Sequence, residues 1–490
     1  MSAPTGTVVN APPARRLSTR TTSAYGFGAV AYGVKDSGFG TFLLLFYNQV
    51  LGLNASAVGL VIMCALILDA LVDPAIGALS DRTRSRWGRR HPWMYASAIP
   101  IAVGWIALWN PPAMSQEATL GWLFVCAVLV RSAVSAYEVP SQALTPELTS
   151  DYDERTRITA YRYLFGWAGG LVMLLLAYRV FLAPGPGYPN GLLRGSGYAH
   201  MALFAAALMV LAIVVSALGT HREIARLPRP AIAAIGIGDH FRQLGQTLRN
   251  RGFAVLMLAG LCAYTAQGIS YAMSNYLYSY VWQFGGTAFG LLPFALFGGV
   301  LIAFGLAPRI GARFGKTRAA TVVVMVGAVL LTTPYALRLA GVFPAPGSPS
   351  LVPILFTIFL LQTAANVSGF ILGASMMADV VEDSEQTTGR RSEGVFFAGS
   401  FFVQKCTSGI GIFAAGTILS LAQFPKLAKP GQVPIATLDR LTLIFLVSYL
   451  ILGLTAAFLF TRFPFGRREH EARLGLGAAA KTPFRATDWR

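Results

Sequence analysis

The amino-acid sequence consists largely of long apolar runs, and these constrain the fold more than any other feature. A helix needs about 20 mostly apolar residues to cross a bilayer. Twelve runs of about that length or longer cover residues 22–52, 55–80, 92–110, 118–146, 157–183, 198–219, 252–283, 287–308, 319–341, 351–381, 392–422 and 437–463. We therefore predict an all-α integral membrane protein with twelve transmembrane helices.

The composition excludes several classes of protein. Hydrophobic residues make up 54% of the 490 residues and charged residues only 12%, whereas soluble domains contain about 25% charged residues. This excludes a cytosolic enzyme and a disordered chain, because too few polar side chains are available to cover the surface. The four cysteines lie far apart inside apolar runs, which excludes a disulfide or zinc framework.

The sequence contains no complete motif for catalysis or nucleotide binding. Gly315-Lys316-Thr317 resembles the end of a phosphate-binding loop, but Ile310 stands where that loop requires its first glycine. A nucleophile elbow, a zinc-protease helix and a Cys/His cluster are also missing from the sequence. We therefore predict that the chain is not an enzyme and has no cofactor.

The net charge of +18 arises mainly from arginines in alternate connections between the apolar runs. The connections after the second, fourth, sixth, eighth, tenth and twelfth runs are basic, and the others contain few charges. Connections rich in Lys and Arg stay in the cytoplasm. We therefore predict cytoplasmic N- and C-termini, no removable signal peptide, and no nucleic acid as a partner.

One long polar connection divides the runs into two sets of six. The predicted order is a cytoplasmic tail (1–21), a six-helix bundle (22–219), a cytoplasmic linker (220–251), a second six-helix bundle (252–463) and a cytoplasmic tail (464–490). An aromatic-Gly-basic sequence follows both the second and the eighth runs, at 87–89 and 314–316. This match at equivalent places favours duplication of a six-helix unit.

Eight charged residues lie inside the apolar runs, where a charge costs about 2.5–3.5 kcal/mol at the centre of a helix. They are Lys35, Asp36, Asp69, Asp73, Arg131, Glu138, Arg162 and Lys405. Asp69 and Asp73 share one face of the second helix. If the second and fourth helices are neighbours, Glu138 joins them at similar depth, and the three carboxylates form a site for Na⁺ or a proton.

The alternative interpretation is that these charges form structural ion pairs. Arg131 and Glu138, which lie two turns apart on one helix, are a candidate pair. Lys405 is expected to pair with one of the buried acids.

Polar side chains also share helix faces in the second half of the chain. They are Tyr264, Gln267, Tyr271 and Asn275 in the seventh helix, and Gln362 and Asn366 in the tenth. Each could bind the hydroxyls of a sugar or form a hydrogen bond between helices.

The run from Asp69 to Trp93 resembles the glycoside-pentoside-hexuronide:cation symporter family, which belongs to the major facilitator superfamily. Further matches lie at 33–36, 137–140, 157–162, 377–382 and 391–394, and at Lys405. The resemblance covers essentially the whole chain. It implies the major facilitator fold, with two six-helix bundles in a bacterial inner membrane, and sugar uptake coupled to Na⁺, H⁺ or sometimes Li⁺.

The resemblance also implies roles for individual residues. The positions that match the family's cation site are Asp69, Asp73, Glu138 and Ser135. The positions that match its sugar contacts are Lys35, Asp36, Glu138 and Arg162. Lys405 matches a lysine that the family associates with the acidic cluster. Gln142 replaces the family's sugar-stacking tryptophan, and Phe401 and Phe402 replace polar residues. These departures leave a different glycoside, a pentoside, an oligosaccharide or a uronide as the expected substrate.

We therefore predict a Na⁺- or H⁺-coupled symporter that carries a sugar or glycoside into the cytoplasm by alternating access, and that works as a monomer. Arg131 and Lys405 are expected to belong to the network of buried charges and to take part in coupling cation binding to transport. The expected cytoplasmic gate consists of Asp81, Arg82, Arg89, Arg90, Asp379, Glu382, Arg390 and Arg391. The alternatives are a major-facilitator carrier of a non-sugar substrate, such as a lysolipid or an organic anion, and a membrane enzyme or sensor.

Overall fold

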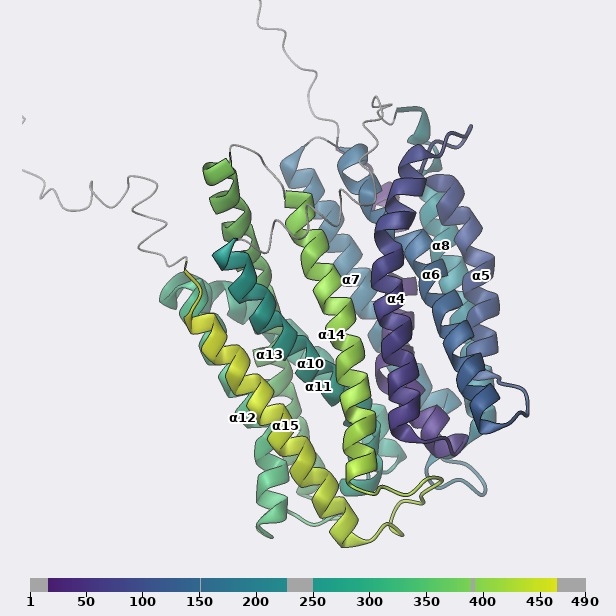
Figure 1. Ribbon diagram of the computed structural model, residues 1–490, viewed down its shortest axis with the longest axis vertical. Helices are drawn as coiled ribbons and strands as arrows, with labels where there is room; N and C mark the ends of the chain where they lie inside the picture. Colours follow the sequence, from purple (N-terminus) through teal and green to yellow (C-terminus); the bar gives the residue numbers. More distant parts are fainter. Residues whose placement is uncertain (1–15, 150, 227–249, 389–392, 465–490) are drawn as a thin grey trace, which may run out of the picture.

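The computed structural model describes residues 16–149, 151–226, 250–388 and 393–464, which are helical almost throughout (Figure 1). The N-terminal half contains α1 (Thr19–Phe27), α2 (Val30–Ser37), η1 (Gly38–Phe42), α3 (Leu43–Leu45), η2 (Phe46–Val50), α4 (Ala55–Arg82), α5 (His91–Trp109), α6 (Gln116–Leu148), α7 (Tyr152–Leu176), η3 (Ala177–Phe181), η4 (Gly191–Leu193), α8 (Gly195–His221) and η5 (Ile224–Arg226). The C-terminal half contains α10 (Arg251–Tyr276), η6 (Leu277–Val281), α11 (Gly286–Phe314), α12 (Lys316–Leu339), α13 (Leu351–Thr388), α14 (Glu393–Leu421) and α15 (Ile435–Thr461).

The all-α prediction is confirmed. Eleven helices in the described part of the chain are long and apolar enough to cross a membrane, and they overlap the second to twelfth predicted runs. The first run is present as a series of short helical segments from α1 to η2. These segments and the eleven long helices together make up the twelve predicted spans.

Glycines lie at junctions between the segments of the first span. Gly28 ends α1 and Gly38 begins the π-helical η1. The backbone also approaches α7 closely, because an ideal Cβ on Gly33 would lie 2.0 Å from the carbonyl oxygen of Gly166. The first, fifth and seventh spans each end in a π-helical turn, η2, η3 and η6.

The helices of each half pack mainly against one another. In the N-terminal half, α4 and α5 contact α6, α5 contacts α8, and α2 contacts α7. In the C-terminal half, α10 contacts α14 and α15, while α13 contacts α11 and α12. The two halves meet along α4 and α14, which lie side by side (Figure 1). The predicted domain boundaries stay a prediction, since most of the linker 220–251 lies outside the described residues.

Glycines on α14 set its distance from the helices on either side. An ideal Cβ on Gly411 would lie 2.5 Å from the carbonyl oxygen of Thr265 and 2.7 Å from the Cα of Gly268, both on α10. One on Gly416 would lie 2.3 Å from the carbonyl oxygen of Ala55 on α4. Small residues let helix backbones approach one another in membranes. The position of α14 against α4 therefore depends on these glycines.

We expect Gly411→Val to lower the thermal unfolding midpoint of the detergent-purified protein, because the added side chain forces α14 away from α10. The matched control is Gly373→Ala on α13, where an added Cβ would meet no atom within 4 Å. A Gly411→Val protein that unfolds at the same temperature as the Gly373→Ala protein contradicts this description of how α14 packs against α10.

Candidate functional site

The contact between α4 and α14 contains a buried cluster of charges. The Lys405 ammonium on α14 lies 2.5 Å from Asp73 Oδ2 and 3.0 Å from Asp69 Oδ2, both on α4. It also donates a hydrogen bond of 3.2 Å to Ser135 Oγ on α6. Asp69 and Asp73 are one helical turn apart, so a single ammonium group contacts both carboxylates. One half of the protein thus supplies the cation and the other half supplies both acids.

The two carboxylates differ in how fully they are bonded. Asp69 accepts two hydrogen bonds from Arg131 at Oδ2, of 2.9 and 2.7 Å, and one of 2.8 Å from Ser135 at Oδ1. Asp73 Oδ1 is buried without a hydrogen-bond partner. A buried acceptor without a partner is costly. Asp73 therefore has the capacity to bind a further donor or a cation.

A second cluster joins α6 to α7. Arg162 donates hydrogen bonds of 2.7 Å to Glu138 Oε1 and to Ser141 Oγ. Gln142 donates a hydrogen bond of 2.9 Å to the same oxygen of Glu138. The Arg162 guanidinium also lies over the ring of Tyr25, whose hydroxyl donates to the carbonyl oxygen of Ser141. Glu138 Oε2 is buried and has no hydrogen-bond partner, so this cluster also retains a free acceptor.

Lys35 and Asp36 form a third pair on α2. The Lys35 ammonium lies 3.7 Å from Asp36 Oδ1 and 4.1 Å from the centroid of the Tyr32 ring. The Lys35 side chain is 3% exposed and that of Asp36 is 53% exposed. Asp36 therefore presents its carboxylate to the surroundings while Lys35 is covered.

The expected cluster of three carboxylates is not formed. Asp69 and Asp73 contact Lys405, whereas Glu138 contacts Arg162. Within the described residues, no three Asp, Glu, His or Cys side chains are grouped so that they could hold a metal ion. A basic side chain faces each acid because uncompensated carboxylates would repel one another in a medium of low dielectric constant.

Two expectations about ion pairs have different outcomes. Arg131 does not pair with Glu138, because its guanidinium turns toward α4 and binds Asp69. Lys405 does pair with buried acids, as predicted, and it contacts two of them. Spacing along one helix could not reveal the Arg131 contact, since the partner is on a neighbouring helix.

The polar residues of the C-terminal half divide into two groups. Gln267 donates a hydrogen bond of 3.2 Å to the hydroxyl of Tyr271, which is an exposed residue. Asn275 bonds the N-terminal half through Thr41 and Tyr178, and it therefore connects helices.

Three further C-terminal residues are mostly covered. Tyr264 stacks on Phe370 with ring centroids 5.5 Å apart, and Asn366 donates to the hydroxyl of Tyr449 at 3.4 Å. Gln362 is buried. Tyr271 is therefore the exposed member of this set, and its partner Gln267 is half-buried.

Charges at one end of the bundle tie loops to helix ends in both halves. Arg89 and Arg90 contact Glu147 at 2.7 and 3.1 Å, and Arg90 also contacts Asp81 at 2.5 Å. Arg82 is exposed.

In the C-terminal half, Lys316 contacts Asp379 at 2.6 Å. Of the expected gate residues, Asp81 and Asp379 each contact a basic side chain, and the sequence reasoning missed Glu147 and Lys316. Glu382 is half-buried, and Arg390 and Arg391 lie outside the described residues.

Hydrogen bonds join the halves at the opposite end of α4. The buried Gln49 donates to Asn48 and to the carbonyl oxygen of Pro425, and it accepts from Tyr280 and from the Ala428 backbone amide. This connection was also missed, because one buried glutamine gives no signal in a single sequence.

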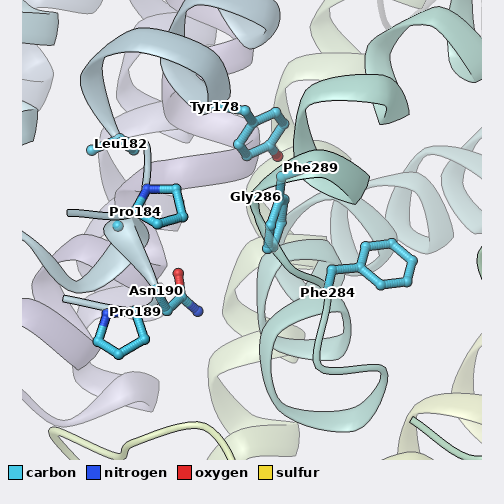
Figure 2. Close-up of a pocket in the computed structure, with 9 residues that line it drawn as sticks. Tyr178, Leu182, Pro184, Pro189, Asn190, Phe284, Gly286 and Phe289 are labelled. Atoms are coloured by element: carbon cyan, nitrogen blue, oxygen red, sulfur yellow. The ribbon is translucent and has the colours of Figure 1, made fainter. Parts of the chain in front are cut away.

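An aromatic contact lies at the same end of the bundle. Figure 2 shows Tyr178 beside Phe289, and the centroids of the two rings are 5.1 Å apart. Pro184 also lies against this contact region, since an ideal Cβ on Gly286 would come within 2.9 Å of its ring. Together with Gln49, these side chains hold the halves closed at this end.

Comparison with known proteins agrees with this arrangement. The profile of a family described as MFS/sugar transport protein matches residues 24–467. The isoprimeverose transporter of Lactiplantibacillus pentosus is 26% identical over 81% of this chain and 79% of its own. The putative glycoside/cation symporter YagG of Escherichia coli is 24% identical over 89% and 90%. The crystal structure of a D-xylose-proton symporter superposes with a TM-score of 0.62, at 12% identity over 91% and 97%.

The chain therefore belongs to the MFS/sugar transport family, and its relatives place it among the glycoside-pentoside-hexuronide symporters of the major facilitator superfamily. It is a multi-pass membrane protein with the major facilitator fold. The resemblance to this family noted in the sequence is confirmed.

We expect Arg131→Met to lower the free energy of unfolding by about 3–5 kcal/mol, because it leaves Asp69 buried with one cation fewer. The measurement is denaturant unfolding in detergent. The double variant Asp69→Asn/Arg131→Met removes the uncompensated charge and should recover part of the loss. An Arg131→Met protein as stable as the unaltered one contradicts the importance of this pair.

Proposed function

We propose that the protein is a cation-coupled symporter that carries a sugar or glycoside into the cytoplasm by alternating access. The observation that carries this proposal is the position of Lys405 between Asp69 and Asp73. The contact lies on the two helices where the halves meet, so anything that competes with the ammonium group changes the interaction between the halves. A coupling ion that binds these carboxylates has this effect.

The proposed cation site consists of Asp69, Asp73 and Ser135. Oxygen ligands suit Na⁺, and a carboxylate also accepts a proton. Asp73 Oδ1 is the free acceptor at which the ion first binds. The ion then displaces Lys405 from Asp73, and the second free carboxylate oxygen, on Glu138, links this site to the substrate.

The proposed substrate site lies between the halves. Asp36, Glu138 and Gln142 accept or donate hydrogen bonds from the N-terminal half, and Arg162 and Lys35 hold these carboxylates in place. The ligands from the C-terminal half are the exposed Tyr271 and its partner Gln267, with Tyr264, Gln362 and Asn366 as further members of the site. By linkage, a cation that raises the affinity for sugar is itself bound more tightly when sugar is present.

The contacts at Gln49 and Tyr178 support one conformational assignment. In the predicted topology this end faces away from the cytoplasm, so the structure corresponds to a state that is closed outside. The ion pairs Arg89–Glu147 and Lys316–Asp379 lie at the other end and stay within their own halves. Exchange between two such states by rocking of the halves is alternating access.

The relatives support the same class of function. One is named an isoprimeverose transporter and another a putative glycoside/cation symporter. These names describe the relatives, and both agree with a glycoside substrate and a coupling cation for this chain.

We expect uptake of labelled glycosides into proteoliposomes to be accelerated at least tenfold by an inward gradient of Na⁺ or of H⁺, with the two gradients imposed separately. Asp73→Asn should remove this acceleration, because the amide cannot bind the ion in place of the carboxylate. The matched control is Asp439→Asn, whose side chain pairs with Arg338 and is 46% exposed.

Two results oppose the proposal. Uptake that ignores both gradients rules out symport. If uptake by the Asp73→Asn protein still depends on the gradient, the ion site does not include Asp73. A lysolipid that stabilises the protein while no sugar does so would favour the alternative class of substrate.

A further inference from the structure

The charges around the proposed substrate site cancel one another almost completely. All four basic side chains of the set contact an acidic one in the described part of the chain. The pairs are Lys35–Asp36 at 3.7 Å, Arg131–Asp69 at 2.7 Å, Arg162–Glu138 at 2.7 Å and Lys405–Asp73 at 2.5 Å. No basic group in this set remains uncompensated.

The exposure of these side chains is also unequal. The basic side chains of Lys35, Arg131, Arg162 and Lys405 are 3%, 5%, 10% and 21% exposed, whereas Asp36 is 53% exposed. Asp36 is therefore the most exposed charged side chain of this set. The strongest accessible charge of the site is negative.

The unused hydrogen-bonding capacity points in the same direction. Asp73 Oδ1 and Glu138 Oε2 are buried carboxylate oxygens without a hydrogen-bond partner. An ionised carboxylate only accepts hydrogen bonds. These two oxygens therefore complement hydroxyl donors and cations.

Exposed aromatic rings lie beside these charges. Tyr32 contacts the Lys35 ammonium, and it is 36% exposed. Tyr271, on the opposite half, is exposed and lies against the first span, since an ideal Cβ on Gly40 would be 3.4 Å from its ring. Aromatic faces pack well against apolar surfaces, and one face of a sugar ring presents C–H groups of this kind.

We propose that the substrate is a neutral polyhydroxylated glycoside, and that uronides and other anions are rejected by the exposed Asp36 carboxylate. This inference rests on the proposed function and narrows its substrate class. The coupling ion adds a positive charge at Asp69 and Asp73, but the most exposed charged side chain of the set is still Asp36. An anion beside this carboxylate would be repelled by it.

The test compares ligands that differ only at carbon 6. The probes are the methyl β-glycosides of glucose and galactose, the corresponding methyl glucuronide and galacturonide, and methyl β-xyloside, which lacks carbon 6. Binding of each is measured by thermal shift of the purified protein in the presence of Na⁺. Uptake of each is measured in proteoliposomes with both Na⁺ and an inward proton gradient present. We expect at least one neutral glycoside to bind at least tenfold more tightly than its uronide.

The Asp36→Asn variant tests the assigned cause. Removing the exposed charge should reduce the preference for the neutral ligand over its uronide, even if the affinity for both declines. The Asp439→Asn control should keep the full preference. An unchanged preference in Asp36→Asn overturns the role of this carboxylate.

Failure of this inference is distinguishable from failure of the proposed function. A uronide that binds or is transported as well as its neutral counterpart overturns the neutral class, while sugar transport still stands. If no neutral sugar and no uronide shifts the unfolding temperature or enters the vesicles, both proposals fall.

Discussion

The contact of Lys405 with Asp69 and Asp73 is the interaction on which the rest of the arrangement depends. Removing three charges from water is expensive, and the cost is repaid only when each group has close, well-oriented partners. Lys405 has these partners only if α14 lies directly against α4, and the glycines on α14 permit that approach. The same contact therefore fixes the interface between the halves and makes it sensitive to any competing cation.

Charge pairing within the N-terminal half has a different role. Arg131 holds Asp69, and Arg162 holds Glu138, and in both cases the partner belongs to a neighbouring helix of the same half. These pairs keep the carboxylates oriented within their own half.

The two ends of the bundle are held by different kinds of contact. Arg89 and Glu147 in one half and Lys316 and Asp379 in the other join a loop to a helix end at equivalent positions. The first and seventh spans end in π-helical turns, near Gln49 and Tyr280, which bond each other. One end thus has its ion pairs inside each half and the other has hydrogen bonds between halves, which is the asymmetry that alternating access requires.

The sequence by itself determined the all-α architecture, the twelve spans and the presence of buried charges, because hydrophobicity and charge are local properties that a bilayer selects strongly. It also predicted that Lys405 binds acids. Only the tertiary structure decided that Arg131 turns to Asp69, that Glu138 separates from the other two carboxylates, and that Gln49 and Glu147 are major connections. Those outcomes depend on which helices become neighbours and on the few ångströms between their side chains, and no spacing along the chain contains that information.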